Sequence, residues 1–225
     1  MNKKFLLALL HFPMMGFAQE NAPKIKDSES GKFQLGMRTV VSTFSDEKYS
    51  GLGLGGQFRL KFGDRLNTEW FADYITTNVG GYATRTDYHI GWTVQYYAFN
   101  KVIEKGKFTP YIEAGHCFDY TNIALDPNDY RCYYSSTVGP MELSRWSSAI
   151  HAGLGTSYNL SDNFDVSLAA MYMMHLGNDL HANIIKGPTD MPTAQLTKGN
   201  AGIEGHLLIT LSLNVYLGKL WGHNK

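Results

Sequence analysis

The sequence predicts an all-β protein, an eight-stranded antiparallel up-and-down transmembrane β-barrel. Three observations lead to this fold class. The chain contains eight segments in which apolar and polar residues alternate, as in strands whose two faces meet different surroundings. The connections between these segments are short at one end and mostly longer at the other. The chain also begins with a stretch that has the organisation of a secretory signal.

The composition excludes several other classes of protein. A length of 225 residues fits one domain, and a formal net charge of zero gives no indication of nucleic-acid binding. The mean hydropathy is −0.24, and no run of about 18 apolar residues follows the N-terminus, which argues against a helical membrane protein. A membrane barrel is compatible with such values, because its strands need apolar residues only at alternate positions.

The N-terminus divides into the three parts of a signal peptide. Lys3 and Lys4 are followed by an apolar stretch at 5–17, and Ala18 closes a small-residue cleavage site before Gln19. A buried N-terminal helix is the less favoured alternative. We therefore expect a signal peptide at 1–18, a flexible periplasmic leader at 19–32 and an outer-membrane β-barrel at 33–225.

The alternating segments define the expected strands, which are mostly long enough to cross a bilayer. They lie at 33–42, 51–62, 67–77, 85–99, 109–120, 145–160, 164–176 and 206–217.

The connections set the orientation. Those at 63–65 and 161–163 are tight turns, and 100–107 is a moderate one, whereas 125–143 and 177–205 are long. A periplasmic N-terminus places the tight turns in the periplasm and the long loops outside, as in outer-membrane barrels. The second long connection, rich in Pro, Asn and Thr, is expected to be mobile rather than structured.

The apolar face is expected to point outward, to lipid, and not inward as in a soluble lipocalin-like barrel. Its side chains are too bulky for the lumen of eight strands, and the polar face is rich in glycine and nearly free of lysine. Aromatic residues of the apolar face also gather near the two ends of the strands, as at membrane interfaces. His116 is a misfit on this face, which a bulge or a position near the headgroups would relieve.

Strand number, turn pattern and signal peptide together resemble the OmpA/OmpX-like outer-membrane β-barrel family, over the whole mature chain. The last alternating segment, 207–217, matches the pattern that the assembly machinery of such proteins reads. The family usually ends on an aromatic residue, whereas here residues 222–225 follow Trp221. We therefore expect no OmpA-like peptidoglycan-binding domain after the barrel. The resemblance implies a Gram-negative outer membrane, contact with its lipid and a barrel-assembly machinery as partner during biogenesis.

Charged and polar residues on the inward face are expected to form a paired network, because buried charges need partners. Such a network would plug the narrow lumen, and a narrow gated pore for small solutes or ions is the alternative. The residues of this lumen network are Arg38, Arg59, Lys61, Glu69, Asp73, Arg85, Asp87, His89, Glu113, Asp119, His151 and His175.

Four of these residues, His89, Asp119, His151 and His175, are expected at similar heights, with Cys117 nearby. Histidine and aspartate can bind a metal or move protons. No short metal-binding spacing supports such a site, so a hydrogen-bonded interior is the favoured interpretation.

The two cysteines, Cys117 and Cys132, either form a disulfide in the oxidising periplasm or remain thiols, and the sequence leaves both open. A disulfide would tie the 125–143 loop to the barrel mouth. This loop carries residue types that are favoured in protein contacts, and its recognition candidates are Tyr130, Arg131, Tyr133 and Tyr134. A solvent-exposed, variable loop without a recognition role is the favoured alternative for this segment.

An enzymatic alternative is a PagL-like deacylase of lipid A, whose signature is His-x-Ser-Asn. The matching stretch starts at His175 but has Gly177 at the position of the nucleophilic serine. We therefore expect a monomeric barrel without cofactor, metal or enzymatic activity. Its expected role is structural, or recognition of an extracellular ligand through the loops.

Overall fold

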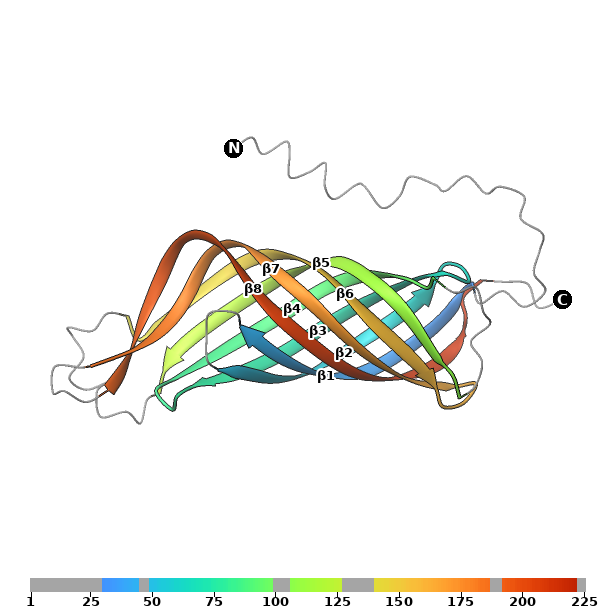
Figure 1. Ribbon diagram of the computed structural model, residues 1–225, viewed down its shortest axis with the longest axis horizontal. Helices are drawn as coiled ribbons and strands as arrows, with labels where there is room; N and C mark the ends of the chain where they lie inside the picture. The colour runs from blue at the N-terminus through green and yellow to red at the C-terminus, as the bar shows by residue number, and fades with distance from the viewer. Residues whose placement is uncertain (1–29, 45–48, 99–105, 127–139, 187–191, 222–225) are drawn as a thin grey trace, which may run out of the picture.

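The computed structural model describes residues 30–44, 49–98, 106–126, 140–186 and 192–221, and these form a closed antiparallel barrel (Figure 1). Within these residues there is no helix that is long and apolar enough to cross a membrane. The strands follow one another around the barrel in chain order, as the sequence predicted. They are β1 (Lys32–Phe44), β2 (Ser50–Lys61), β3 (Leu66–Val79), β4 (Ala83–Tyr96), β5 (Phe108–Leu125), β6 (Glu142–Asn159), β7 (Phe164–Lys186) and β8 (Pro192–Lys219).

Pairing between β1 and β8 closes the barrel, with Val40 opposite Thr210. Both described ends of the chain lie together at the end that carries the tight turns (Figure 1). There the backbone N–H of Leu220 donates to the carbonyl of Gly31 over 2.8 Å. At the opposite end, β3 and β4 are joined through Gly80 and Gly81, whose φ angles of 62° and 78° favour glycine. Following the orientation expected from the sequence, we call these the periplasmic and outer ends.

Alternation along each strand separates an apolar exterior from a buried interior. Large apolar side chains cover the outside, among them Met37 (75% exposed), Leu52 (66%) and Trp146 (76%). The predicted outer aromatic girdle is present as a row of rings that crosses four strands, Tyr74–Tyr88–Tyr120–Trp146, with neighbouring centroids 4.9–6.1 Å apart. The predicted fold class, including the outward direction of the apolar face, is confirmed.

The misfit at His116 is accommodated without a bulge. No register shift interrupts the pairing of β5 with β4 or with β6. The half-buried ring of His116 instead has Nε2 2.6 Å from Oγ of Ser148 and packs edge-on against Phe118. A polar partner on the neighbouring strand thus satisfies the imidazole on the apolar face.

The prediction of a mobile loop at 177–205 was wrong for most of that segment. Residues 177–186 of β7 pair with 192–202 of β8, past the point where the described parts of β6 and β1 pair with them. We call this two-stranded extension the outer ribbon; it projects at the outer end in Figure 1. Leu180, Ala194 and Leu196 on its buried face pack with Val79 and Ile123, which explains why the segment is ordered in spite of its prolines.

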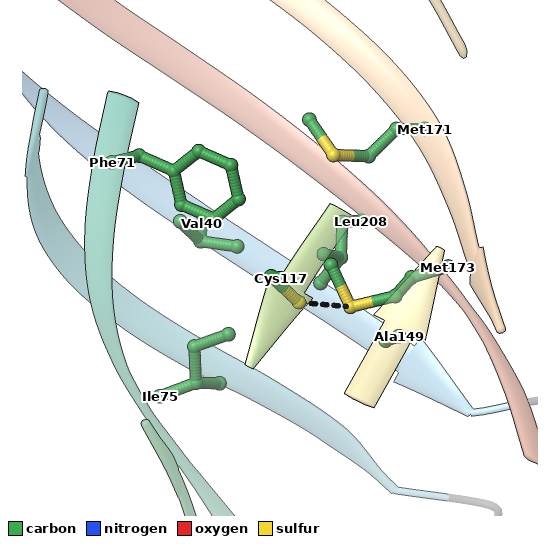
Figure 2. Close-up of a cluster of buried hydrophobic side chains, with 8 residues drawn as sticks. All are labelled: Val40, Phe71, Ile75, Cys117, Ala149, Met171, Met173 and Leu208. Atoms are coloured by element: carbon green, nitrogen blue, oxygen red, sulfur yellow. Dashed lines mark hydrogen bonds between the residues drawn. The ribbon is translucent and has the colours of Figure 1, made fainter. Parts of the chain in front are cut away.

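The interior is layered and not uniformly polar. The buried side chains of β7 run from Asp165 through Met171 and Met173 to His175 and then Leu180. An apolar layer, drawn in Figure 2, therefore lies along β7 between two polar stretches, and the ribbon contacts form a second apolar layer at the outer mouth. The middle apolar layer consists of Val40, Phe71, Ile75, Cys117, Ala149, Met171, Met173 and Leu208.

Candidate functional site

The lumen holds all twelve residues of the predicted polar network, and each of them is buried. The structure divides them into a periplasmic group around Glu69 and an outer group around His175, with the apolar layer of Figure 2 between.

Glu69 is the junction of the periplasmic group. Its Oε1 accepts a hydrogen bond from Nη1 of Arg38 over 3.0 Å, and its Oε2 accepts one from Nε of Arg59 over 2.5 Å. Arg38 also pairs with Asp73 (3.1 Å), and Nη1 of Arg59 lies 3.3 Å from Oδ1 of Asp165. Since Arg59 belongs to β2 and Asp165 to β7, which are not neighbours in the sheet, this chain of ion pairs crosses the lumen.

Amide side chains extend the periplasmic group. Gln57 donates to Asn214 over 2.6 Å, and Asn214 in turn donates to Asp165 over 2.8 Å. Gln95 donates to both Glu69 and Glu113. Ion pairs and amide hydrogen bonds thus connect opposite sides of the lumen, as a plug of paired charges requires.

The outer group contains three buried histidines from three strands, which we call the histidine cluster: His89 of β4, His175 of β7 and His206 of β8. Nε2 of His175 lies 3.1 Å from Nε2 of His206. One nitrogen of each ring lies within 4.8 Å of the other two.

Two of the three rings are oriented by neighbouring side chains. Nδ1 of His175 lies 3.1 Å from Oδ2 of Asp119, and Nδ1 of His206 lies 2.9 Å from Oγ of Ser42. Both contacts use Nδ1, so the Nε2 atoms of these two rings are directed toward each other. His89 differs, because neither of its nitrogens has a hydrogen-bond partner among the described residues.

Two carboxylates and two arginines flank the cluster. Arg85 pairs with Asp87 at 3.2 Å, and Nη2 of Arg145 lies 4.0 Å from Asp119. The hydroxyl of Thr121 donates to Asp87 over 2.7 Å and lies 3.2 Å from Asp119. The carboxylates beside the histidine cluster are therefore held in place.

The structure groups the histidines differently from the sequence analysis. It brings His89, His175 and Asp119 together, but His151 lies apart, with Nε2 2.9 Å from Oγ1 of Thr93 and its ring against Phe71. Sequence reasoning missed His206, although a signal was present. His206 has the same parity along β8 as the inward-facing Thr210 and Ser212.

Cys117 is a free thiol in the apolar layer, 3.6 Å from the sulfur of Met173 (Figure 2). Of the two states that the sequence left open, the structure thus has the unpaired thiol at this position. Cys132 lies outside the described residues, as do the signal peptide, most of the leader and the recognition candidates Tyr130, Arg131, Tyr133 and Tyr134.

The histidine of the stretch that resembles the deacylase signature does not face lipid. His175 is fully buried in the lumen beside Asp119, in agreement with its expected inward direction. A side chain added at Gly177 would approach Ser147.

Comparison with solved structures places this architecture among known barrels. Neisserial surface protein A is 15% identical, with 85% of this chain and 100% of that chain covered and a TM-score of 0.51. The outer membrane protein OprG from Pseudomonas aeruginosa is 19% identical over 84% of this chain and 96% of its own, with a TM-score of 0.48.

No known family profile matches the sequence, and no curated protein matches it. Likeness at these identities concerns the fold. Together with the apolar exterior, the strand order shows that the chain has the fold of a small eight-stranded, up-and-down β-barrel, as Neisserial surface protein A does.

Proposed function

We propose that this barrel is closed to solutes and that its role is structural, or one of recognition at the outer end. The observation that carries the proposal is the chain of ion pairs Arg38–Glu69–Arg59–Asp165, which spans the lumen between the opposite strands β3, with Glu69, and β7, with Asp165. Eight strands leave room for little more than the side chains themselves.

A narrow channel lined by the same charged groups is the alternative. Conduction requires groups that can exchange their partners for a passing ion. The buried charges of the periplasmic group already bind one another, and apolar side chains fill the lumen on the outer side of them. This arrangement favours the plug.

The outer ribbon supports a role at the cell surface. It is a paired and ordered extension, anchored through Leu180 and Leu196 onto the mouth of the barrel. A rigid element of this kind can present neighbouring loops at low entropic cost. The 125–143 loop, with Tyr130 and Arg131, remains the proposed recognition segment.

Recording in planar bilayers tests the closed lumen. Protein that shows the heat-dependent gel shift of a folded barrel should give no steady conductance. A Glu69→Ala variant, which breaks the chain of ion pairs, serves as the comparison because it should show more frequent transient openings. Steady, ion-selective conductance of the wild-type protein would instead establish the channel.

Cross-linking on intact cells tests the recognition role. The wild-type protein is compared with a variant in which residues 127–139 are replaced by a Gly-Ser linker of equal length. A cross-linked partner that disappears in the variant supports recognition through this loop, and an unchanged pattern supports a purely structural role. The lipid A mass of the same cells should be unaltered, and a change in it would support the enzymatic alternative.

A further inference from the structure

The histidine cluster has the donor set of a transition-metal site. Imidazole nitrogen suits Zn²⁺, Cu²⁺, Ni²⁺ and Co²⁺, and three histidines with one open position form a common zinc centre. We propose that His89, His175 and His206 bind one divalent transition-metal ion of this class inside the lumen.

The spacing of the cluster fits this chemistry. Two nitrogens bound tetrahedrally at 2.0–2.1 Å lie about 3.3 Å apart. The Nε2 atoms of His175 and His206 are 3.1 Å apart, and the third ring offers a nitrogen within 4.8 Å of both. Binding would require His89 to move closer to the other two rings, and water or a small anion would complete the tetrahedron.

The neighbours of the cluster act as the outer shell of a metal site. Histidine ligands commonly donate their second N–H to a carboxylate or another oxygen acceptor, which fixes the tautomer and raises the basicity of the ligating nitrogen. Asp119 lies at Nδ1 of His175 and Ser42 at Nδ1 of His206, and both contacts leave Nε2 for the ion.

His89 provides an independent observation. Its side chain is completely buried, yet neither nitrogen has a hydrogen-bond partner among the described residues. Buried polar groups are nearly always partnered, so an unpartnered imidazole directed at two others calls for a ligand. The hydrogen-bonded interior that the sequence favoured accounts for His175 and His206, but it leaves His89 unexplained.

The position of the cluster indicates what a bound ion would do. The cluster lies between the apolar layer of Figure 2 and the apolar layer under the outer ribbon. An ion there would be shielded from both ends and would link β4 to β7 and β8 across the lumen. It would stabilise the barrel, and it would enter while the barrel folds.

Metal content after refolding tests the proposal. Protein without an affinity tag is unfolded with chelator, refolded into detergent with Zn²⁺, or in parallel with Co²⁺, Ni²⁺ or Cu²⁺, and separated from free ion. We expect about one zinc ion per folded chain by mass spectrometry. The melting temperature should rise with Zn²⁺, since a ligand that binds only the folded state stabilises it.

Two variants locate the ion. His89→Leu loses no hydrogen bond among the described residues, so the barrel should still fold and show its gel shift, but without zinc or a melting shift. His151→Leu removes a buried lumen histidine outside the cluster and should keep both. The proposal is overturned if the wild-type protein retains none of Zn²⁺, Co²⁺, Ni²⁺ or Cu²⁺. It is also overturned if His89→Leu binds as much as the wild type, or if His151→Leu loses binding equally.

Discussion

At the residue scale, the stability of the barrel depends on single buried carboxylates that pair with more than one arginine. Glu69 is buried and compensates two guanidinium groups at once, those of Arg38 and Arg59. Arg38 and Arg59 also contact Asp73 and Asp165, so one carboxylate connects partners from four strands. A buried charge that loses its partner is costly, because water cannot replace that partner in a filled lumen.

Glu69→Ala should therefore lower the free energy of unfolding by about 3–5 kcal/mol, the cost of leaving buried arginines without compensation. Urea unfolding in liposomes, followed by tryptophan fluorescence, measures this change. The control is Glu142→Ala, which removes an exposed glutamate of β6 and should stay within about 0.5 kcal/mol of the wild type. Equal effects of the two substitutions would show that the Glu69 ion pairs contribute nothing to stability.

At the scale of elements, one part of β7 lies in the barrel wall and the other part forms the outer ribbon. Its outward residues Leu168 and Ala170 lie between Phe164 and Tyr172, which mark the two interfaces. Beyond Leu176 the same strand leaves the wall of the barrel and enters the outer ribbon. A charged side chain on the outward face of β7 should therefore be least tolerated midway between Phe164 and Tyr172.

Leu168→Arg should destabilise the barrel by about 2–4 kcal/mol, because it places a guanidinium near the middle of the bilayer. Leu217→Arg, near the periplasmic end of β8, should cost only about 0–1 kcal/mol. Both side chains are about half exposed, so depth in the membrane is the main difference between them. A cost that is the same at both depths would contradict the assigned position of the lipid.

Leu196→Ala should loosen the outer ribbon without unfolding the barrel. Loss of a buried leucine costs about 2–5 kcal/mol, and here the cost falls on the docking of the ribbon. Trypsin cleavage at Lys186 and Lys198 should become roughly 30-fold faster or more, because it follows the population of the open form. Asn183→Ala, an exposed change on the same ribbon, should leave the rate unaltered, and an equal acceleration there would argue against the apolar anchor.

At the scale of the whole molecule, the alternating pattern was sufficient to predict the barrel, its strand order and its outward apolar face. These features depend on a period of two residues, which each strand carries in its own sequence. The same pattern placed Arg38, Glu69 and Asp119 in the lumen, where the structure also has them.

Other features depend on which side chains meet across the lumen, and one strand's sequence does not contain that information. His206 escaped notice because its partners lie 31 and 117 positions away, in His175 and His89. The apolar layer was missed because Met171 and Leu208 lie at positions whose parity assigns them to the inward face, which was expected to be polar. The outer ribbon was missed because Gly177, Pro188 and Pro192 suggested a loop. They obscured the two-residue spacing that places Leu180 and Ala182, and likewise Ala194 and Leu196, on one apolar face.

The chain carries its own reporter for the closed lumen, because Cys117 is a fully buried thiol in the middle apolar layer. The measurement is the labelling of Cys132→Ser protein with a water-soluble maleimide, before and after unfolding. A filled lumen predicts that folded, gel-shifted barrel stays unlabelled and that the unfolded chain reacts completely. Labelling of the folded barrel as fast as that of the unfolded chain would show that water and reagent reach the centre, and would contradict a plugged barrel.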